Sequence, residues 1–356
     1  MSDTIYFYKD RPIFGLDIGA SSAKFVQLNK QGNKCTIQGY GSAQYDKSYI
    51  AKGEIINFEG VANAIHKSFS EGIKGKVSTH RVIFSVPAAF TYSRIISLPN
   101  SLDIKDIPEA VNTETQQYLP TALSELYTDY SIIDSHDKER RVLTVAVPKK
   151  IIDSYMTLAD ILGLEVIAME PSTGASNRLF DFTDQHKVPS VLIDFGAYST
   201  DITVYDKSLV VTGTINKGGE DFVKTIEEKL SVTRTEAHTI LTRYGFNVSK
   251  RQDEIRSGMK PFMDDLSKEV QRMVRYYEER VNDQKKKIGQ IVTLGGGANL
   301  PGLTDYLTMM LRLPVRPYDP WSTILFDELK RPPVGEETIY VTAAGLALLK
   351  PEEPFL

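Results

Sequence analysis

Short runs of alternating apolar and polar residues occur at two places along the chain. The first set reads FGLDIG, AKFVQL and KCTIQGYGSA, within residues 14–43. The second reads VLIDFG, TDITVYD and LVVTGTIN, within residues 191–216. Such alternation is typical of half-buried strands, and the polar turns between the runs favour β-hairpins. The pattern therefore predicts two equivalent sheets, each containing three strands joined by tight turns.

Helical spacing follows each set of strands. Phe58–Ser70 repeats apolar residues at the helical period, and Gly219–Leu230 begins with two acids, which suit the positive end of a helix dipole. A long helix is expected over about Pro261–Lys287. Its apolar positions form one stripe, which we expect to face the core. These positions are Phe262, Leu266, Val270, Met273, Tyr277 and Val281.

A separate small unit is expected between the two sets, at about Val86–Val147. It begins with VPAAFTYSRIISLP, continues through a predicted helix IPEAVNTETQQYL, and ends in the strands YTDYSIID and RRVLTVAVP. One strand, a helix and two strands suffice for a small α+β subdomain. Its position predicts an insertion into the first half of the chain.

Length and charge narrow the class of protein. With 356 residues the chain is longer than a single core usually supports, so two or more domains are expected. A formal net charge of -4 argues against a dedicated nucleic-acid-binding protein, which normally has a basic face. The one dense basic run, Lys285–Lys287, is interpreted as the solvated end of a helix, with a membrane-surface or partner role as the alternative.

The single cysteine and the apolar runs indicate the cellular compartment of the protein. Cys35 alone excludes an intramolecular disulfide and a multi-cysteine zinc site, and it is expected to be a packed free thiol in a reducing cytoplasm. Charged residues interrupt residues 1–15, so no signal-peptide core is predicted there. The apolar run Ile339–Leu349 is about half as long as a membrane span requires. We expect neither export nor membrane insertion.

Two glycine turns suggest phosphate chemistry. Asp17–Ser22 and Asp194–Thr200 each place a glycine beside hydroxyl side chains after an apolar strand. Glycine lets backbone N–H groups approach a phosphate, and two facing turns can hold one polyphosphate between them. The alternative is that each glycine only permits a tight hairpin.

The aspartates at these turns suggest a metal ion. Asp17 and Asp194 each lie at the end of an apolar strand, where a buried carboxylate is costly unless a cation or donors meet it. Mg²⁺ held mainly through water molecules and bridging phosphate oxygens fits such carboxylates. Alternatively, each aspartate caps its own turn.

A third glycine cluster lies in IVTLGGGANLPGL, between an apolar strand and a helix expected to begin near Leu303. Consecutive glycines let a flat ring or a phosphate approach the backbone, and the following helix adds a favourable dipole. After two phosphate-type turns, this cluster is interpreted as the adenosine side of the same site.

Taken in order, these motifs resemble those of a known superfamily. Two Asp-x-Gly hairpins, the connecting segment AMEPSTGASNRL, a GGEDF segment and the GGGAN turn are similar to the nucleotide motifs of the actin, sugar-kinase and heat-shock chaperone superfamily. The resemblance implies an α/β, actin-like two-domain ATPase fold, with duplicated ribonuclease H-like domains around a cleft that holds ATP (or ADP) and Mg²⁺.

Runs outside the nucleotide motifs resemble one branch of that superfamily more closely. GEIINFEGVANAIHKSF, SRIISLP, EAVNTETQQYLP and GLEVIAMEPSTGASNR are similar in order and spacing to the PilM family of type IV pilus assembly proteins, relatives of the division protein FtsA. The resemblance implies an inserted small α+β subdomain of FtsA/PilM type. The expected division is residues 1–85, 148–188 and 338–356 in the first domain (1A), 86–147 in the insertion (1C), 189–217 and 288–337 in the second domain (2A), and 218–287 in subdomain 2B.

The resemblance also implies a set of site residues. The first phosphate turn comprises Asp17, Gly19, Ala20, Ser21, Ser22 and Lys24, and the second comprises Asp194, Gly196, Ala197, Ser199, Thr200 and Asp201. The Mg²⁺ ligands would be Asp17 and Asp194, and the catalytic carboxylates Glu170 and Asp194. Gly218, Gly219 and Glu220 would lie by the ribose, Glu269 and Arg272 beside the base, and Gly295, Gly296, Gly297 and Asn299 beneath it. The alternative for Glu170 is an acid at a helix N-terminus near Pro171.

The function implied by the resemblance is a cytoplasmic ATP-binding scaffold. It would bind the cytoplasmic N-terminal segment of a PilN-like bitopic membrane protein, and through it associate peripherally with the inner membrane. The expected groove wall is Ser93–Pro99 with Ile107–Tyr118. Pilus assembly ATPases and further copies of the chain are additional candidate partners, and nucleic acid is not expected.

Turnover is expected to be slow or absent, because the catalytic lysine typical of chaperones has no recognisable counterpart. The alternatives are an FtsA-like filament-forming ATPase and a small-molecule kinase of the same superfamily. The first would be expected to end in a membrane-targeting amphipathic helix, whereas this chain ends KPEEPFL. The second would require an acceptor-binding loop, and no such segment stands out.

Overall fold

The first half of the chain forms a six-stranded sheet in the order β11-β7-β1-β2-β3-β6. The computed structural model describes residues 11–31, 34–135, 138–184, 187–281 and 286–350. Strands β1, β2 and β3 form the predicted antiparallel hairpins, while β7 and β11 run parallel to β1. The strands are β1 (Phe14–Ile18), β2 (Ser22–Gln31), β3 (Lys34–Gln44), β6 (Lys74–Gly75), β7 (Arg81–Val86) and β11 (Glu165–Pro171).

The second half repeats this topology in a five-stranded sheet, in the order β14-β13-β12-β15-β16. Strands β12, β13 and β14 form antiparallel hairpins, and β15 and β16 are parallel to β12. The strands are β12 (Ser190–Phe195), β13 (Thr200–Asp206), β14 (Ser208–Ile215), β15 (Gln290–Leu294) and β16 (Val315–Pro317). The prediction of two equivalent sheets is therefore confirmed.

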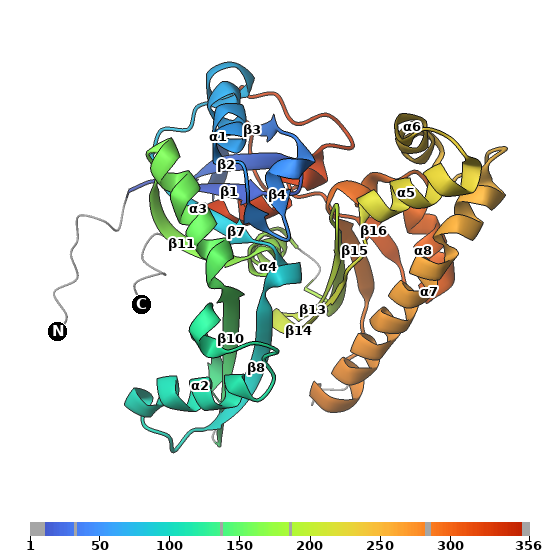
Figure 1. Ribbon diagram of the computed structural model, residues 1–356. Helices are drawn as coiled ribbons and strands as arrows, with labels where there is room; N and C mark the ends of the chain where they lie inside the picture. Colours follow the sequence, from blue (N-terminus) through green and yellow to red (C-terminus); the bar gives the residue numbers. More distant parts are fainter. Residues whose placement is uncertain (1–10, 32–33, 136–137, 185–186, 282–285, 351–356) are drawn as a thin grey trace.

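Helices lie on both faces of the first sheet (Figure 1). Helices α1 (Phe58–Lys67) and α3 (Lys149–Leu162) pack against it through a core shared with β1, β2 and β7. Helices α4 (Ser172–Thr183) and α9 (Val341–Ala347) contribute to a different core, which also contains Val292 of the second sheet. One continuous core thus joins the two sheets, because isolated apolar faces of this size would be costly in water.

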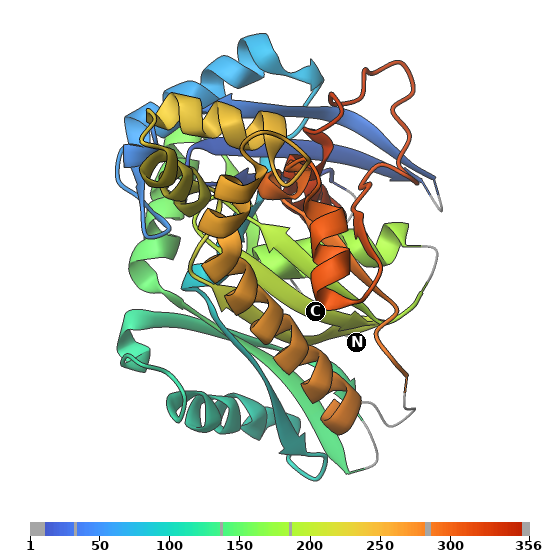
Figure 2. The ribbon, with the colours of Figure 1, turned by 90° about the vertical axis from the view of Figure 1, so that its right-hand side faces the viewer.

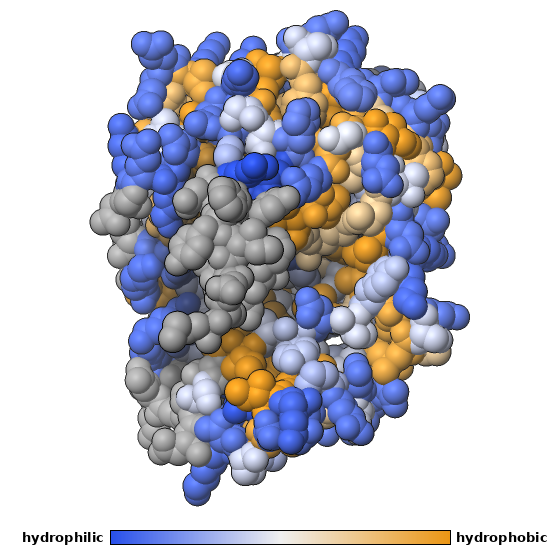
Figure 3. Space-filling view, turned by 90° about the vertical axis from the view of Figure 1, so that its left-hand side faces the viewer, coloured by the Kyte–Doolittle hydropathy of each residue, from blue (hydrophilic) through white to orange (hydrophobic). Residues whose placement is uncertain are grey.

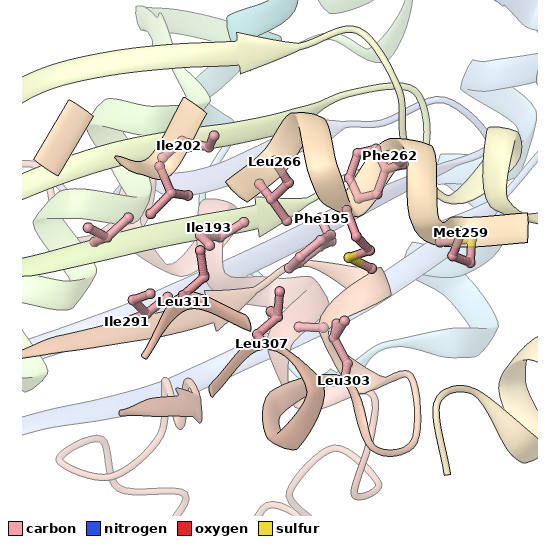
Figure 4. Close-up of a cluster of buried hydrophobic side chains, with 14 of the residues drawn as sticks. Ile193, Phe195, Ile202, Met259, Phe262, Leu266, Ile291, Leu303, Leu307 and Leu311 are labelled. Atoms are coloured by element: carbon pink, nitrogen blue, oxygen red, sulfur yellow. The ribbon is translucent and has the colours of Figure 1, made fainter. Parts of the chain in front are cut away.

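Helices α5 (Gly219–Leu230), α6 (Arg234–Tyr244), α7 (Gln252–Tyr276) and α8 (Leu303–Leu311) accompany the second sheet. Long α7 lies across its strands (Figure 2). Side chains from α7, from α8 and from the strands meet in one cluster (Figure 4). The expected apolar stripe of α7 is buried at Phe262, Leu266, Val270, Met273 and Tyr277, while the side chain of Val281 lies outside the described residues.

The start of α7 corrects the sequence prediction. The helix begins at Gln252 rather than near Pro261, which lies inside it. Buried Ile255 and Met259 continue the apolar stripe upstream, so packing favours the helix through a position that proline alone would disfavour. The described helical turns end at Val281, and Lys285 of the basic run lies outside the described residues.

The predicted insertion forms a three-stranded sheet in the order β8-β10-β9, with α2 (Ile107–Gln116) on one face. Its strands are β8 (Tyr92–Pro99), β9 (Leu126–Ser135) and β10 (Glu139–Pro148). The expected strand, helix and two strands are all present, and the unit extends from the body of the molecule (Figure 1). The domain boundaries given above stay a prediction, and residues 1–10 and 351–356 of that division lie outside the described residues.

Short elements connect these units. They are β4 (Ile50–Ala51) and β5 (Glu54–Ile55), and the single helical turns Lys47–Tyr49, Ser68–Gly72, Ala88–Phe90, Ile104–Asp106, Leu123–Glu125, Tyr277–Val281, Gly296–Asn299 and Glu337–Tyr340.

After β16 the chain crosses back to the first sheet, in a stretch over residues 318–340 that we call the return segment. The Leu325 N–H donates to the Cys35 carbonyl at 2.9 Å, and the Leu325 carbonyl accepts from the Ile37 N–H at 2.8 Å. Trp321 is fully buried in the core that joins the sheets. Cys35 is a buried free thiol, as predicted, and burial raises its pKa to about 11.

Within the described ranges, no helix is both long and apolar enough to cross a bilayer. On the face that carries α3 and β11, hydrophobic side chains are interspersed with hydrophilic ones (Figure 3). Helix α3 exposes Met156 and Ile161, but single exposed apolar side chains are usual in globular proteins.

Candidate functional site

A cavity of about 500 Å³ lies where the turns after β1, β12 and β15 meet. These turns come from both sheets, so the cavity lies between the two halves of the molecule. Most residues of the predicted site line it. They are Asp17, Gly19, Ala20, Ser21, Ser22, Lys24, Asp194, Gly196, Ala197, Ser199, Asp201, Gly219, Glu220, Gly295, Gly296 and Gly297.

The two hairpins carry different charge pairs at equivalent positions. In the first hairpin Asp17 lies directly across from Lys24 on the neighbouring strand. In the second hairpin Asp194 lies directly across from Asp201. Opposite charges across a strand pair are favourable, whereas like charges are not. The second hairpin therefore brings an uncompensated negative charge to the cavity.

The electrostatic consequence appears in the second hairpin. Burial, together with the neighbouring Asp201 and Asp17 carboxylates, raises the pKa of Asp194 to about 7, and Lys24 partly opposes this. Burial also raises the pKa of Asp201 to about 6, although hydrogen bonds from Thr214 and Ser199 favour its charged form. Ionising Asp194 and Asp201 together near neutral pH is thus costly without a cation.

Hydroxyl groups hold the first turn in place. The Ser85 hydroxyl on β7 donates to Asp17 Oδ1 at 2.5 Å. The Tyr45 hydroxyl, just after β3, donates to the Gly19 carbonyl at 2.7 Å. One donor comes from β7, beside β1, and the other from the end of β3, so two different parts of the first sheet support the turn.

These carboxylates fit a hydrated cation rather than a closed metal site. No cluster of three or more metal-ligating side chains is found among the described residues. Mg²⁺ typically uses one or two carboxylates and keeps its other positions for water and phosphate oxygens. Asp17, Asp194 and Asp201 can supply the negative charge that such an ion requires.

Gly295 shows why glycine is needed at the third turn. Its φ is +79°, a conformation that side chains other than glycine rarely adopt. A Cβ at this position would also collide with Asp194 Oδ1. The Gly295 carbonyl accepts a hydrogen bond from the Thr338 hydroxyl at 2.9 Å, which ties the turn to the return segment.

Several predicted residues lie outside the cavity lining, and their roles stay predictions. Thr200 is fully buried and donates to the Lys217 carbonyl, while the Gly218 N–H donates to Asp221 Oδ2. The Asn299 side-chain amide donates to the Gly335 carbonyl at 2.6 Å and to the Thr338 hydroxyl at 2.9 Å. These contacts place the three residues behind the turns that line the cavity.

Glu269 and Arg272 are also outside the lining. They pair with each other on α7, with Arg272 Nε 2.9 Å from Glu269 Oε2. The Glu269 carboxylate faces β14 at Gly213. Helix register therefore turns both side chains away from the cavity in this structure.

Glu170 is held in an ion pair. Arg178 Nη1 and Nη2 donate to its two carboxylate oxygens at 2.5 and 2.8 Å. Arg178 also donates to the Gly345 carbonyl, so the pair links β11 to α4 and α9. Both oxygens are engaged, and Glu170 does not line the cavity.

Glu220 lies at the cavity edge and connects the two halves. It pairs with Arg234 of α6, and Lys47 from the first half approaches it at 3.4 Å. Lys47 and Glu220 are both partly exposed, so this contact is expected to be weak and salt-sensitive.

Sequence reasoning missed several cavity residues. Ser172, His238, Thr242, Thr338 and Thr342 all line the cavity, together with the apolar Phe222, Leu241, Leu300 and Ile339. His238 and Thr242 are one helical turn apart on α6, so they share a helix face. This spacing is common in any helix, and no local signal marked it as part of a site.

Known proteins resemble this chain over most of its length. The family model described as "Type IV pilus assembly protein PilM" matches residues 15–350. A cell division protein FtsA of Staphylococcus epidermidis is 24% identical over 345 residues, covering 86% of this chain and 74% of that protein.

Solved structures show the same fold. A PilM-PilN type IV pilus biogenesis complex matches with a TM-score of 0.82 at 19% identity, covering 95% of this chain and 98% of that chain. MreB5 of Spiroplasma citri, solved with AMPPNP, matches with a TM-score of 0.54 at 12% identity, covering 94% and 95% of the two chains. The predicted actin-like two-domain α/β fold is confirmed.

Proposed function

The chain belongs to the family of the type IV pilus assembly protein PilM, and from this premise we propose that it is a nucleotide-binding scaffold of a type IV pilus machine. In this role it binds ATP or ADP with Mg²⁺ and the cytoplasmic N-terminal segment of a PilN-like membrane protein. That partner attaches it to the inner membrane from the cytoplasmic side. The family match favours this role over the filament-forming and kinase alternatives.

The observation that carries the nucleotide part is the meeting of the two aspartate hairpins in one cavity. The polyphosphate would lie between Gly19–Ser22 and Gly196–Ser199, where backbone and hydroxyl donors of both halves converge. Mg²⁺ would lie among Asp17, Asp194 and Asp201 and offset the charge that raises the pKa of Asp194. Lys24 would face the phosphate from the first hairpin.

The base would lie on the α6 side of the cavity. His238 and Thr242 present polar groups there, and Leu300 and Gly297 provide an apolar floor. Glu269 faces β14 and Arg272 pairs with it, so the contacts to the base move from α7 to α6 in this proposal. The ribose would remain near Gly219 and Glu220, as predicted.

Hydrolysis is expected to be slow or absent. Glu170, the predicted water-positioning carboxylate, has both oxygens bound by Arg178. A carboxylate held in this way is poorly placed to orient a water molecule, because both of its oxygens already accept hydrogen bonds from the arginine. Nucleotide would then serve as a structural or switching ligand.

Isothermal titration tests the nucleotide part. Wild type should bind Mg·ATP at one site, and Asp194→Ala should bind at least ~10-fold more weakly, since charge-assisted contacts contribute about 1.5–3 kcal/mol. Asp305→Ala removes an exposed acid from α8 and serves as the matched control. Equal binding by wild type and Asp194→Ala, or no binding by wild type, contradicts the proposal.

The three-stranded sheet suggests where the partner docks. The predicted groove between β8 and α2 is filled by the chain itself, because Ile96 and Leu98 pack against Ile107 and Val111 in one core cluster. The opposite face of this sheet is not covered by α2. It carries half-buried Ile95, which lies directly across from Leu143.

This opposite face continues into the body of the molecule. Val145 follows on the same face and packs against the core of the first domain. Tyr127 of β9 lies nearby on the same face, and its hydroxyl donates to Asp153 of α3 at 3.1 Å. An apolar strip between a sheet and α3 can accept an extended peptide with apolar side chains.

Fluorescence anisotropy tests the partner part. A labelled peptide with the sequence of the PilN-like protein's cytoplasmic N-terminal segment should bind the wild type. Leu143→Glu should weaken binding at least ~10-fold, because it places a charge on the proposed apolar strip. Ile104→Glu changes an exposed residue near α2 and should bind as wild type does. Equal peptide binding by Leu143→Glu and wild type would contradict the proposed docking surface. No peptide binding by wild type would contradict the proposed partner.

A further inference from the structure

The cavity continues past the first phosphate turn along the edge of the first sheet. Strands β1, β7 and β11 are parallel neighbours in this order, and Val86 of β7 lies directly across from Pro171 of β11. Parallel strands end at the same edge of a sheet, so the segments that follow them lie next to one another. These segments are the turn after β1, Pro87–Phe90 and Ser172, and all of them line the cavity.

Pro87–Phe90 and Ser172 form the end of the cavity beyond the hairpin turns. In the proposed binding mode the base lies beside α6, the ribose near α5, and the polyphosphate between the two turns. A terminal phosphate that extends past the first turn then reaches the ends of β7 and β11. Ser172 has the only polar side chain among these five lining residues. Its hydroxyl is therefore the side-chain donor that such a phosphate would meet.

Ser172, the first residue of α4, is also tied to the segment after β7. Its hydroxyl oxygen accepts a hydrogen bond from the Ala88 N–H at 3.3 Å. A serine hydroxyl that accepts one hydrogen bond still has its own proton to donate. No residue within the described ranges accepts that proton, so it remains free for an acceptor in the cavity.

The turn at Ala88–Phe90 leads directly into β8, the first strand of the insertion. The Thr91 N–H donates to the Ala88 carbonyl at 3.0 Å, and the Thr91 hydroxyl donates to the Pro87 carbonyl at 3.1 Å. These bonds close the turn and join it to the strand. The second connection of the insertion, at residues 147–149, does not line the cavity. The cavity thus contacts the base of the insertion at the Ala88 turn.

We propose that Ser172 distinguishes ATP from ADP by donating its hydroxyl proton to the terminal phosphate of ATP, and that this bond fixes the Ala88 turn at the base of the insertion. A hydroxyl that donates to a charged group becomes a better acceptor, because hydrogen bonds in a chain polarise one another. ATP therefore strengthens the bond from the Ala88 N–H, and ADP does not. The inference rests on the proposed function, because it places the terminal phosphate in the same site.

Nucleotide titrations test the first part. ADP is compared with AMPPNP, an ATP analogue that keeps a terminal phosphate, in excess Mg²⁺. Ser172→Ala should raise the dissociation constant for AMPPNP by about 10-fold or more and leave that for ADP unchanged, since hydrogen bonds to charged groups are among the strong ones. Ser172→Thr keeps the hydroxyl and should bind both nucleotides as wild type does.

Ser154→Ala is the matched control. The Ser154 hydroxyl also accepts a hydrogen bond from a backbone N–H, that of Ile55 at 3.2 Å, but Ser154 lies outside the cavity lining. This variant should bind ADP and AMPPNP with the same ratio of dissociation constants as wild type.

Hydrogen exchange of backbone amides tests the second part. In wild type, residues 88–91 should exchange about 3-fold more slowly with Mg·AMPPNP than with Mg·ADP, the effect of strengthening one hydrogen bond. Ser172→Ala should remove this difference, whereas Ser172→Thr and Ser154→Ala should retain it. Both measurements use the whole protein and require no partner.

Other outcomes overturn the inference. Unchanged AMPPNP binding by Ser172→Ala shows that the hydroxyl does not meet the terminal phosphate, and an equal loss of ADP and AMPPNP binding shows a structural role instead. Exchange of residues 88–91 that is the same with both nucleotides in wild type contradicts the link to the insertion. Failure of wild type to bind either nucleotide is a different result, since it removes the proposed function itself and the inference with it.

Discussion

Replacing Asp194 with asparagine tests the charge crowding in the second hairpin. The amide has nearly the same shape as the carboxylate but cannot ionise, so the change removes one negative charge opposite Asp201. In wild type the pKa of Asp194 is raised from 3.8 to about 7. A raised carboxyl pKa means that the folded state binds its proton more tightly than the unfolded state does.

The sign of the pH dependence follows from this. The stabilising effect of the proton is complete below the unfolded pKa of 3.8 and is lost as pH rises through about 7. The full pKa difference corresponds to about 4 kcal/mol of folding free energy. Because solvent in the cavity screens part of the charge, we expect about 1–2 kcal/mol.

The assay is thermal unfolding between pH 5 and 8.5 without metal or nucleotide. Asp194→Asn should unfold about 1–3 °C above wild type at pH 8.5 and at nearly the same temperature at pH 5. Asp305→Asn removes the same charge from an exposed position in the first turn of α8 and should show no such trend. Adding Mg·ATP should reverse the order at pH 8.5, because wild type gains more from the metal.

A difference between wild type and Asp194→Asn that is as large at pH 5 as at pH 8.5 would refute the reasoning. So would equal stabilisation of both proteins by Mg·ATP, since the carboxylate would then contribute nothing to metal binding.

Three further substitutions probe other parts of the site. Gly295→Ala should lower the unfolding free energy by more than about 2 kcal/mol. Gly163 has a similar positive φ but no neighbour within 4 Å, so Gly163→Ala should lower it by only about 1 kcal/mol. Equal losses of the two variants in chemical denaturation would contradict the steric argument. Glu170→Gln should lower the unfolding free energy by about 1–3 kcal/mol and leave the Mg·ATP dissociation constant unchanged, because the Glu170 oxygens bind Arg178. Weaker Mg·ATP binding by this variant in titration would restore the catalytic interpretation of Glu170. Lys47→Ala should speed the release of a fluorescent ATP analogue by about 2- to 3-fold at low salt and have no effect on it at 0.5 M NaCl. If stopped-flow measurements still show faster release at high salt, the ion pair with Glu220 is not the cause of the effect.

The parts of the site that the sequence predicts are those encoded by local pattern. The hairpins around Asp17 and Asp194 need only alternating strands and a glycine turn, and the structure has them at the expected positions. Helices α5 and α8 begin where their residues indicated, at Gly219 and Leu303. Such features depend on neighbours within about ten residues, so one sequence contains enough information to place them.

The features that were missed depend on contacts between distant segments. Thr338 reaches Gly295 only because the return segment crosses between the sheets, and Ser172 reaches the cavity from the start of α4. The resemblance implies Glu269 beside the base, but helix register decides which way that side chain points, and a shift of one residue changes its direction by about 100°. The predicted start of α7 was wrong because tertiary packing outweighed the local effect of Pro261.

The most direct test of the central claim is a crystal structure of the protein grown with ADP and Mg²⁺. The account predicts density for the nucleotide in the cavity, with its phosphates between Gly19–Ser22 and Gly196–Ser199 and its base beside His238 and Thr242 of α6. The metal should lie among Asp17, Asp194 and Asp201. An empty cavity at millimolar nucleotide, or a nucleotide bound elsewhere, would contradict the claim that the two hairpins form one phosphate site.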